Sequence, residues 1–220
     1  MNKLFSPDNP VMEFITKLVA SVLVNILWFI CSLPIITIGP STTALFYCSQ
    51  KLARDEGSHI TSAFFRSFKL NFKQSTIVGL ILTLISAALV FDGFILRRLY
   101  RTSAFWTLVT AVFLVAVAAV IVISMWIYPL MARFENSIMA MFKNSIMLGM
   151  RFFLCTLIMF GIYFIMGFLV INIMTPLIIF GFGTCAFFCS LLQRNILIML
   201  EGPDPEDEII EDVIVEEAEM

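Results

Sequence analysis

Charged residues are scarce in this chain, and their scarcity excludes an ordinary soluble domain. Only 14% of the 220 residues are charged, whereas 60% are hydrophobic and the mean hydropathy is +0.97. A soluble domain has about 25% charged and roughly 45–50% apolar residues. Because long apolar runs fill most of the chain, we expect an integral membrane protein whose main partner is the lipid bilayer.

Residues for metal, disulfide or catalytic chemistry are also few. The chain has a single histidine, His59, and five cysteines without a CxxC pair, so we expect neither a metal site nor a disulfide framework. HExxH, P-loop and GxSxG motifs are missing. Gly181, Gly183 and Ala186 match a dinucleotide-binding spacing, but no strand precedes them, so they are interpreted as small residues for helix packing. We predict no enzymatic activity, no cofactor and no nucleic-acid partner.

The apolar runs predict five membrane spans. The first run is longer than a signal-peptide core of roughly 7–15 residues and no small-residue cleavage site follows it, so we expect it to be retained. The alternative is four spans, with the region around residues 174–176 re-entrant. The five predicted spans cover residues 18–33 with an apolar continuation to 38, 76–96, 104–130, where Pro129 ends or kinks the helix, 152–171 and 177–192.

Polar stretches between the spans predict helices at the membrane surface. Residues 40–54 are interpreted as a short amphipathic helix, residues 60–74 as a helix in the headgroup layer, and residues 132–148 as a further amphipathic stretch. The predicted fold class is therefore all-α, a polytopic membrane helical bundle. It has about five transmembrane helices and two cytoplasmic amphipathic interfacial helices.

Charge divides the chain into two parts. Residues 201–220 contain ten acids and no base, so residues 1–200 hold all 14 bases and six acids. We predict one transmembrane domain over residues 1–200 and an acidic, disordered tail over 201–220. Aliphatic residues interleaved with the acids leave open a second interpretation, in which the tail binds a partner or docks on a basic cytoplasmic surface.

Loop charges favour one orientation in the cell membrane. With the N-terminus outside and the C-terminus in the cytoplasm, nine bases lie inside and five outside. The three arginines of residues 97–101 oppose this assignment, because it places them outside.

The stretch from Leu33 to Ala44 breaks the helical pattern between the first span and the first polar segment. Pro34 cannot donate to the carbonyl of Ile30, and Gly39 is pushed out of the helical region by Pro40. A new helix would then open with three hydroxyls, which cap it or bind an anion such as a headgroup phosphate; capping is favoured. The candidate hinge or functional residues are Pro34, Thr37, Gly39, Pro40, Ser41, Thr42 and Thr43.

Two polar residues inside predicted spans complete the list of candidates. Asn25 lies in the middle of the first span, where it binds a substrate or, as we favour, a neighbouring helix. Asp92 is the only acid inside a span, and an intramembrane carboxylate is a functional hypothesis by default. Since Arg97 and Arg98 follow within two turns, a local ion pair or an interfacial position is favoured over a functional role.

Three blocks of the sequence resemble the YesL-like family of bacterial integral membrane proteins, a family of unknown function. They are Leu33–Ala44 with Asn25, Leu27 and Trp28 before it, residues 65–74, and residues 128–137. The resemblance covers residues 12 to about 200, without the acidic tail. It implies an origin in Gram-positive bacteria and genes beside those for carbohydrate ABC transporters and two-component regulators. It implies no active-site residues.

Two functions are consistent with these observations. The first is a non-enzymatic accessory or regulatory subunit for carbohydrate uptake, with an ABC-transporter permease or a membrane sensor as partner, or a second copy of the chain. The second is a small-molecule transporter or channel, in which the broken first helix lines the path. Because the spans contain few polar groups for a translocation route, we favour the first.

Overall fold

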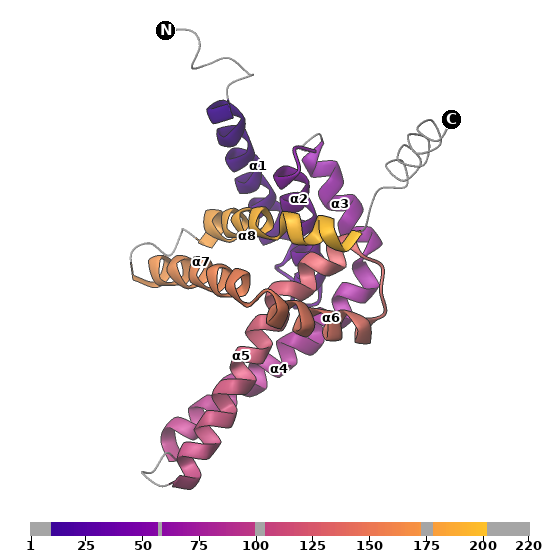
Figure 1. The fold of residues 1–220 in the computed structure, drawn as a ribbon. Helices are drawn as coiled ribbons and strands as arrows, with labels where there is room; N and C mark the ends of the chain where they lie inside the picture. Colours follow the sequence, from indigo (N-terminus) through magenta and orange to yellow (C-terminus); the bar gives the residue numbers. More distant parts are fainter. Residues whose placement is uncertain (1–9, 57–58, 100–103, 173–177, 202–220) are drawn as a thin grey trace, which may run out of the picture.

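The computed structural model describes residues 10–56, 59–99, 104–172 and 178–201. Over these residues the chain folds into helices, which confirms the all-α prediction (Figure 1). Residues 202–220 lie outside the described residues, so the assignment of a disordered tail stays a prediction. In chain order the elements are α1 (Pro10–Cys31), the 3-10 turn η1 (Ile35–Thr37), α2 (Ile38–Ala53), α3 (Ile60–Leu70), α4 (Phe72–Leu99), α5 (Ala104–Arg133), α6 (Ile138–Arg151), α7 (Phe153–Asn172) and α8 (Ile178–Glu201).

Five of the described helices are long and apolar enough to cross a membrane: α1, α4, α5, α7 and α8. This confirms the prediction of five such helices. The bounds of α4, α5 and α7 agree with the sequence pattern to within a few residues, because hydropathy changes sharply at their ends. Helix α1 begins at Pro10, before the apolar run at residues 18–33, and α8 continues beyond residue 192 to Glu201, where the apolar character of the sequence ends.

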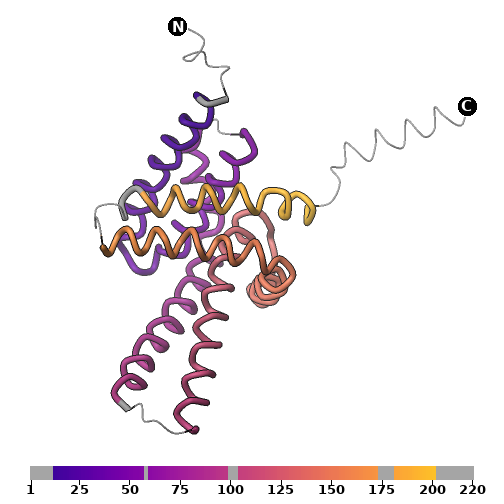
Figure 2. The backbone as a smooth tube through the Cα atoms, turned by 60° about the vertical axis from the view of Figure 1, so that its left-hand side comes forward, coloured from indigo at the N-terminus to yellow at the C-terminus, as the bar shows by residue number. Residues whose placement is uncertain are grey.

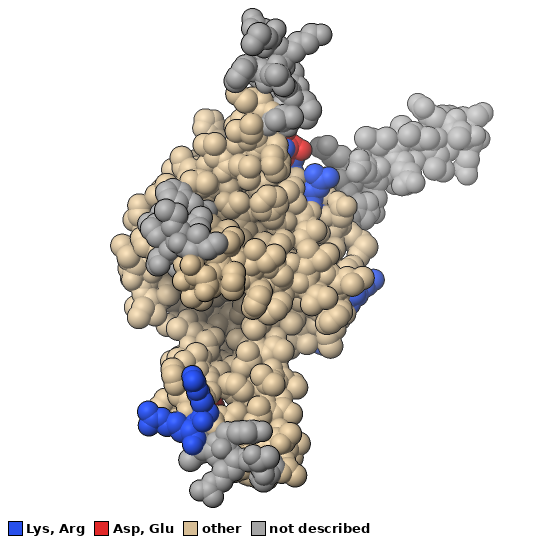
Figure 3. All heavy atoms as spheres, turned by 90° about the vertical axis from the view of Figure 1, so that its left-hand side faces the viewer, with Lys and Arg blue, Asp and Glu red and all other residues tan. Residues whose placement is uncertain are grey.

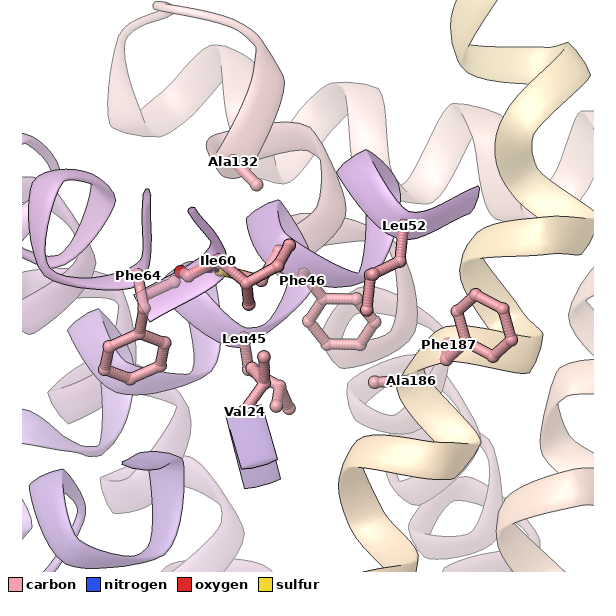
Figure 4. Packing of buried hydrophobic residues seen from close by; sticks show 11 residues of the cluster. Val24, Leu45, Phe46, Leu52, Ile60, Phe64, Ala132, Ala186 and Phe187 are labelled. Atoms are coloured by element: carbon pink, nitrogen blue, oxygen red, sulfur yellow. Dashed lines mark hydrogen bonds between the residues drawn. The ribbon is translucent and has the colours of Figure 1, made fainter. Parts of the chain in front are cut away.

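Helix α2 forms the centre of the molecule, which differs from the surface helix expected at residues 40–54. It is buried over most of its length and packs against α1, α3, α4, α5 and α8. In Figure 4, Leu45, Phe46 and Leu52 of α2 lie among Val24 and Phe187 of the neighbouring helices. The first half of α2 is rich in small side chains, which allow several helices to approach it at once. Its modest amphipathic pattern therefore serves packing inside the protein.

Helix α2 runs back along α1, so the two form a hairpin. Lys17, in the second turn of α1, makes an ion pair with Asp55, which follows the end of α2. Helix α3 then packs along α2 and leads into α4. The hairpin places the start of α1 and the end of α2 at one end of the molecule, and the corner at the other end of both helices.

Two long apolar hairpins leave this centre in different directions. The α4–α5 hairpin and the α7–α8 hairpin run crosswise to each other in both views (Figures 1 and 2). Only 6% of the most apolar stretch of α5 and 11% of that of α7 is buried inside the protein. Lipid or another membrane protein must therefore cover most of their surface.

The two predicted interfacial stretches differ in detail from their sequence pattern. Phe64 and Phe68 of α3 pack into the core, whereas Phe65 is exposed beside Arg66, so aromatic and basic residues share the outer face. Helix α6 begins at Ile138 rather than near residue 132, because α5 continues through Pro129 to Arg133. Ser137 caps α6 by accepting a hydrogen bond from the backbone N–H of Ala140.

Candidate functional site

The corner between α1 and α2 satisfies its own backbone. The Thr37 hydroxyl donates to the carbonyls of Cys31, at 2.6 Å, and Pro34, at 2.8 Å. Leu33, Ile35 and Ile36 expose 71%, 65% and 56% of their surface. Exposed aliphatic side chains over a hydrogen-bonded turn fit hydrocarbon rather than water. The corner is therefore an apolar tip, which corrects the expectation that it turns the chain onto the polar membrane surface.

The three hydroxyls that open α2 serve as contacts between helices. The hydroxyl of Ser41 lies 2.6 Å from that of Ser32, the residue after α1, and Thr42 accepts a 3.1 Å bond from the indole of Trp28 of α1. Thr43 is completely buried, 2.9 Å from the hydroxyl of Ser75 of α4. Each also bonds a carbonyl of the preceding turn. They neither cap α2 nor face solvent. Because these hydroxyls already donate to carbonyls of α2 and the turn before it, they are not available to bind an anion.

Gly39 lies at the closest approach of α2 to α4. A Cβ atom at Gly39 would lie 2.0 Å from the carbonyl oxygen of Ser75 and 3.2 Å from the Cα of Gly79. A Cβ atom at Gly79 would likewise lie 2.8 Å from the Cα of Gly39. Two facing glycines thus bring the helix backbones into contact. The sequence predicted that Pro40 pushes Gly39 out of the helical region; this is wrong, because Gly39 and Pro40 both lie in the first turn of α2. Gly79 was missed because its role depends on a helix far away in the chain.

Asn25 joins α1 to α8. Its Oδ1 accepts a 2.8 Å hydrogen bond from the backbone N–H of Gly183, and Asn25 itself is fully buried. Gly183 is needed here, because a Cβ atom would lie 2.6 Å from the Cβ of Asn25 and 2.8 Å from the carbonyl of Ser21. This agrees with the interhelical interpretation of Asn25 and with the small-residue interpretation of Gly183.

Asp92 does not join these contacts. It is exposed near the far end of the α4–α5 hairpin, and neither Arg97 nor Arg98, both of which the structure describes, makes an ion pair with it. The predicted local ion pair with these two arginines is therefore not formed. Position alone explains Asp92, because an exposed carboxylate near a helix end reaches the aqueous boundary.

Two buried glutamines were missed from the sequence. Gln50 of α2 donates a 2.9 Å bond to the carbonyl of Pro129, and Gln193 of α8 donates a 3.3 Å bond to the carbonyl of Met125. They expose 2% and 0% of their surface. The sequence signal that could have identified them is a glutamine within an apolar helix, because such a side chain needs a polar partner. Only the fold shows that both partners lie on α5.

A cluster of charges joins the ends of four helices. Arg54, after α2, makes a two-bond contact of 2.9 and 3.0 Å with Glu201 at the end of α8, and Arg133 at the end of α5 also bonds Glu201. Arg194 donates to the carbonyl of Ala53 at 3.1 Å. The hydrogen bond from Lys17 holds the pKa of Asp55 below its usual value. Figure 3 shows a separate group of bases at the far end of the α4–α5 hairpin.

A cavity lies between α2 and the two apolar hairpins. It has a volume of about 300 Å³. Its wall is mostly aliphatic and aromatic, with hydroxyls from Thr42, Ser86, Ser124, Tyr128 and Tyr163. Within the described ranges no group of three His, Cys, Asp or Glu residues is placed to hold a metal ion. The cavity suits an apolar molecule, and the hydroxyls could orient one polar group on it.

Comparison with known proteins relates one third of the chain to a family. Neither a curated protein nor a solved structure matches the sequence. The profile of a family described as "Protein of unknown function, DUF624" matches residues 21–93. This range holds Asn25, the corner, α2, α3 and the Gly39–Gly79 crossing, whereas residues 128–137 lie outside it. The part of the chain that is similar to this family of unknown function is thus the part that builds the centre of the fold.

Proposed function

We propose that this chain is a non-enzymatic accessory or regulatory subunit of a membrane complex for carbohydrate uptake, and a member of the YesL-like family. The observation that carries the proposal is the exposure of α5 and α7, one helix from each of the two diverging apolar hairpins. A carrier encloses a polar route between its helices. Here the polar side chains of α1 and α2 instead bond neighbouring helices, and only 6% of the most apolar stretch of α5 is buried. The ABC-transporter partner comes from the sequence resemblance.

Crosslinking from the exposed hairpins tests this proposal. A photo-reactive amino acid at Val115 of α5, which is 70% exposed, should capture a transporter permease or a sensor subunit in native membranes. The same amino acid at buried Val24 is the control and should capture no other protein. Repeated capture of lipid alone from Val115, together with purification in mild detergent without any transporter or sensor, would refute the accessory function.

The central cavity favours a second candidate function, a small-molecule carrier. Its hydroxyls come from α2, α4, α5 and α7, so a solute there would contact both apolar hairpins. Purified protein in vesicles should then move a sugar or ion, and a Ser124→Phe variant should abolish the flux by filling the cavity. Absence of flux in the unaltered protein would exclude this function.

We propose that both chain ends face the cytoplasm, which changes the N-terminal side predicted from loop charges alone. Lys17 pairs with Asp55, and Arg54 pairs with Glu201. The start of α1, the end of α2 and the end of α8 therefore lie on the same side of the membrane. From Lys17 to Cys31 the helix rises about 21 Å, less than the roughly 30 Å of a bilayer core. The α1–α2 hairpin would therefore enter the membrane and return, while α4 and α5 cross it.

This arrangement also improves the charge balance. Moving Lys3 and Lys17 to the inside changes the bases from nine inside and five outside to eleven and three, in the direction of the positive-inside rule. The side of the membrane on which Glu13 lies distinguishes the two orientations. In intact cells an impermeant maleimide should label an Arg98→Cys variant but neither Glu13→Cys nor Thr61→Cys. Labelling of Glu13→Cys would restore an outside N-terminus.

A further inference from the structure

A polar cavity lies at the charged end of the fold, apart from the central cavity. It has a volume of about 190 Å³ and forms where α2, α3, the end of α5 and the segment after α5 meet. Its wall includes one aromatic hydroxyl, two guanidinium groups, two short polar side chains and one carboxylate. These are Tyr47, Arg66, Arg133, Ser67, Asn71 and Glu135.

The two arginines of the wall differ in how they are held. Arg133 is fixed in place, because its Nε and Nη2 both bond the carboxylate of Glu201, which Arg54 also holds. Arg66 is exposed and pairs with none of the acids that the structure describes. Glu135 also lines the wall and opposes an anion. An anion in the cavity would therefore interact most strongly with Arg66, the arginine of the wall that forms no ion pair with a described acid.

An exposed apolar side chain belongs to the wall of the same cavity. Leu70 lines it and is 74% exposed, and two further residues of this stretch of chain, Phe65 and Phe72, are 43% and 37% exposed. Lys69 and Lys73 are exposed in the same stretch. Apolar residues beside bases are typical of a surface at the boundary between lipid headgroups and acyl chains. A soluble anion would explain the bases but not the exposed leucine in the wall.

We propose that this cavity binds the phosphate of an anionic phospholipid, with Arg66 as the principal contact and Leu70 against the acyl chains. Basic pockets on the cytoplasmic side of membrane proteins hold anionic headgroups in this way. The charge cluster of Arg54, Arg133 and Glu201 lies beside the cavity. The site would therefore place a lipid headgroup at the junction of α2, α3, α5 and α8.

Native mass spectrometry of the full chain in nanodiscs tests the site. Protein released from discs of phosphatidylglycerol and phosphatidylcholine should retain the anionic lipid selectively. Arg66→Gln should lower this retention about five-fold, because a base near the surface contributes about 1 kcal/mol, and 1.36 kcal/mol is a factor of ten. Lys143→Gln, which removes an exposed base of α6 that does not line the cavity, should leave it unchanged. Glu135→Gln should raise it.

Four outcomes would overturn the proposal. Equal retention of both lipids would show that no anionic site exists. Equal losses in Arg66→Gln and Lys143→Gln would show diffuse charge attraction. Displacement by millimolar inorganic phosphate would show a site for a soluble anion. Selective retention that arises only after removal of residues 202–220 would show that the acidic tail occupies the cavity in the full chain.

Discussion

The side-chain amide of Gln193 on α8 donates a hydrogen bond to the backbone carbonyl of Met125 on α5. Met125 lies four residues before Pro129, which has no N–H to donate to that carbonyl. Helix α8 thus supplies the donor that α5 lacks, and Gln50 of α2 bonds the carbonyl of Pro129 itself. With these contacts α5 continues through its proline to Arg133.

Gln193 and Pro129 should therefore be coupled in stability. Gln193→Met leaves the carbonyl of Met125 without a donor, and we expect a loss of about 1 kcal/mol in unfolding free energy. A buried group left without a partner costs about 1–3 kcal/mol, and we expect the low end of this range. The reason is that Oε1 of Gln193 has no hydrogen-bond partner in the described part of the chain, so the substitution also removes one unsatisfied buried atom. In a Pro129→Ala background the alanine N–H reaches Met125, so the same substitution should cost less. Denaturation of all four proteins in detergent measures the coupling, and equal losses in both backgrounds would contradict it.

Gly39 should not tolerate even one methyl group. In Gly39→Ala the new Cβ would overlap the carbonyl of Ser75, with an expected cost of at least about 1–3 kcal/mol. Gly161→Ala is the matched control, because nothing lies within 4 Å of a Cβ there and alanine favours a helix. Size-exclusion profiles and thermal unfolding should show loss of folded protein for Gly39→Ala alone. A well-folded Gly39→Ala protein would show that α2 and α4 do not approach so closely.

Asn25 should contribute more to stability than a comparable asparagine outside the centre. Asn25→Leu removes the acceptor for the N–H of Gly183, and buried hydrogen bonds between membrane helices contribute about 0.6 to 1.7 kcal/mol. Asn172 donates to the carbonyl of Phe168 within α7 and is exposed, so Asn172→Leu should change little. Thermal shifts of the two variants give the comparison. Loss of solute flux with unchanged stability in Asn25→Leu would instead favour a substrate-binding role.

The Lys17–Asp55 pair should make stability depend on pH in the acid range. Lys17 lowers the pKa of Asp55, so the pair stabilises the folded state above the ordinary aspartate pKa of about 3.9. This contribution disappears as pH falls through the lowered pKa of the folded state. Asp55→Asn should unfold at a slightly lower temperature than the unaltered protein at pH 7, and the difference should shrink as the pH falls below about 3.9. The effect is small because Asp55 is exposed. A difference that does not shrink over this acid range would assign it to another contact.

Several features of the centre could not be predicted from the sequence. Ser41, Thr42 and Thr43 follow a proline break, which is typical of capping, but their partners Ser32, Trp28 and Ser75 lie outside α2. Hydropathy also failed to separate α2 from a surface helix. In a membrane protein, residues that face lipid and residues that face protein are equally apolar, so composition does not tell a central helix from a peripheral one.

The sequence by itself determined that the chain is helical, that five helices are long and apolar enough to cross a membrane, and that the first breaks at Pro34. These properties follow from local hydropathy and from the backbone limits of proline. Only the tertiary structure decided that α2 lies at the centre, that it returns to the end of α1 that holds Lys17, and that Gln193 completes the backbone of α5. Each of these depends on contacts between distant segments, whose geometry no local pattern specifies.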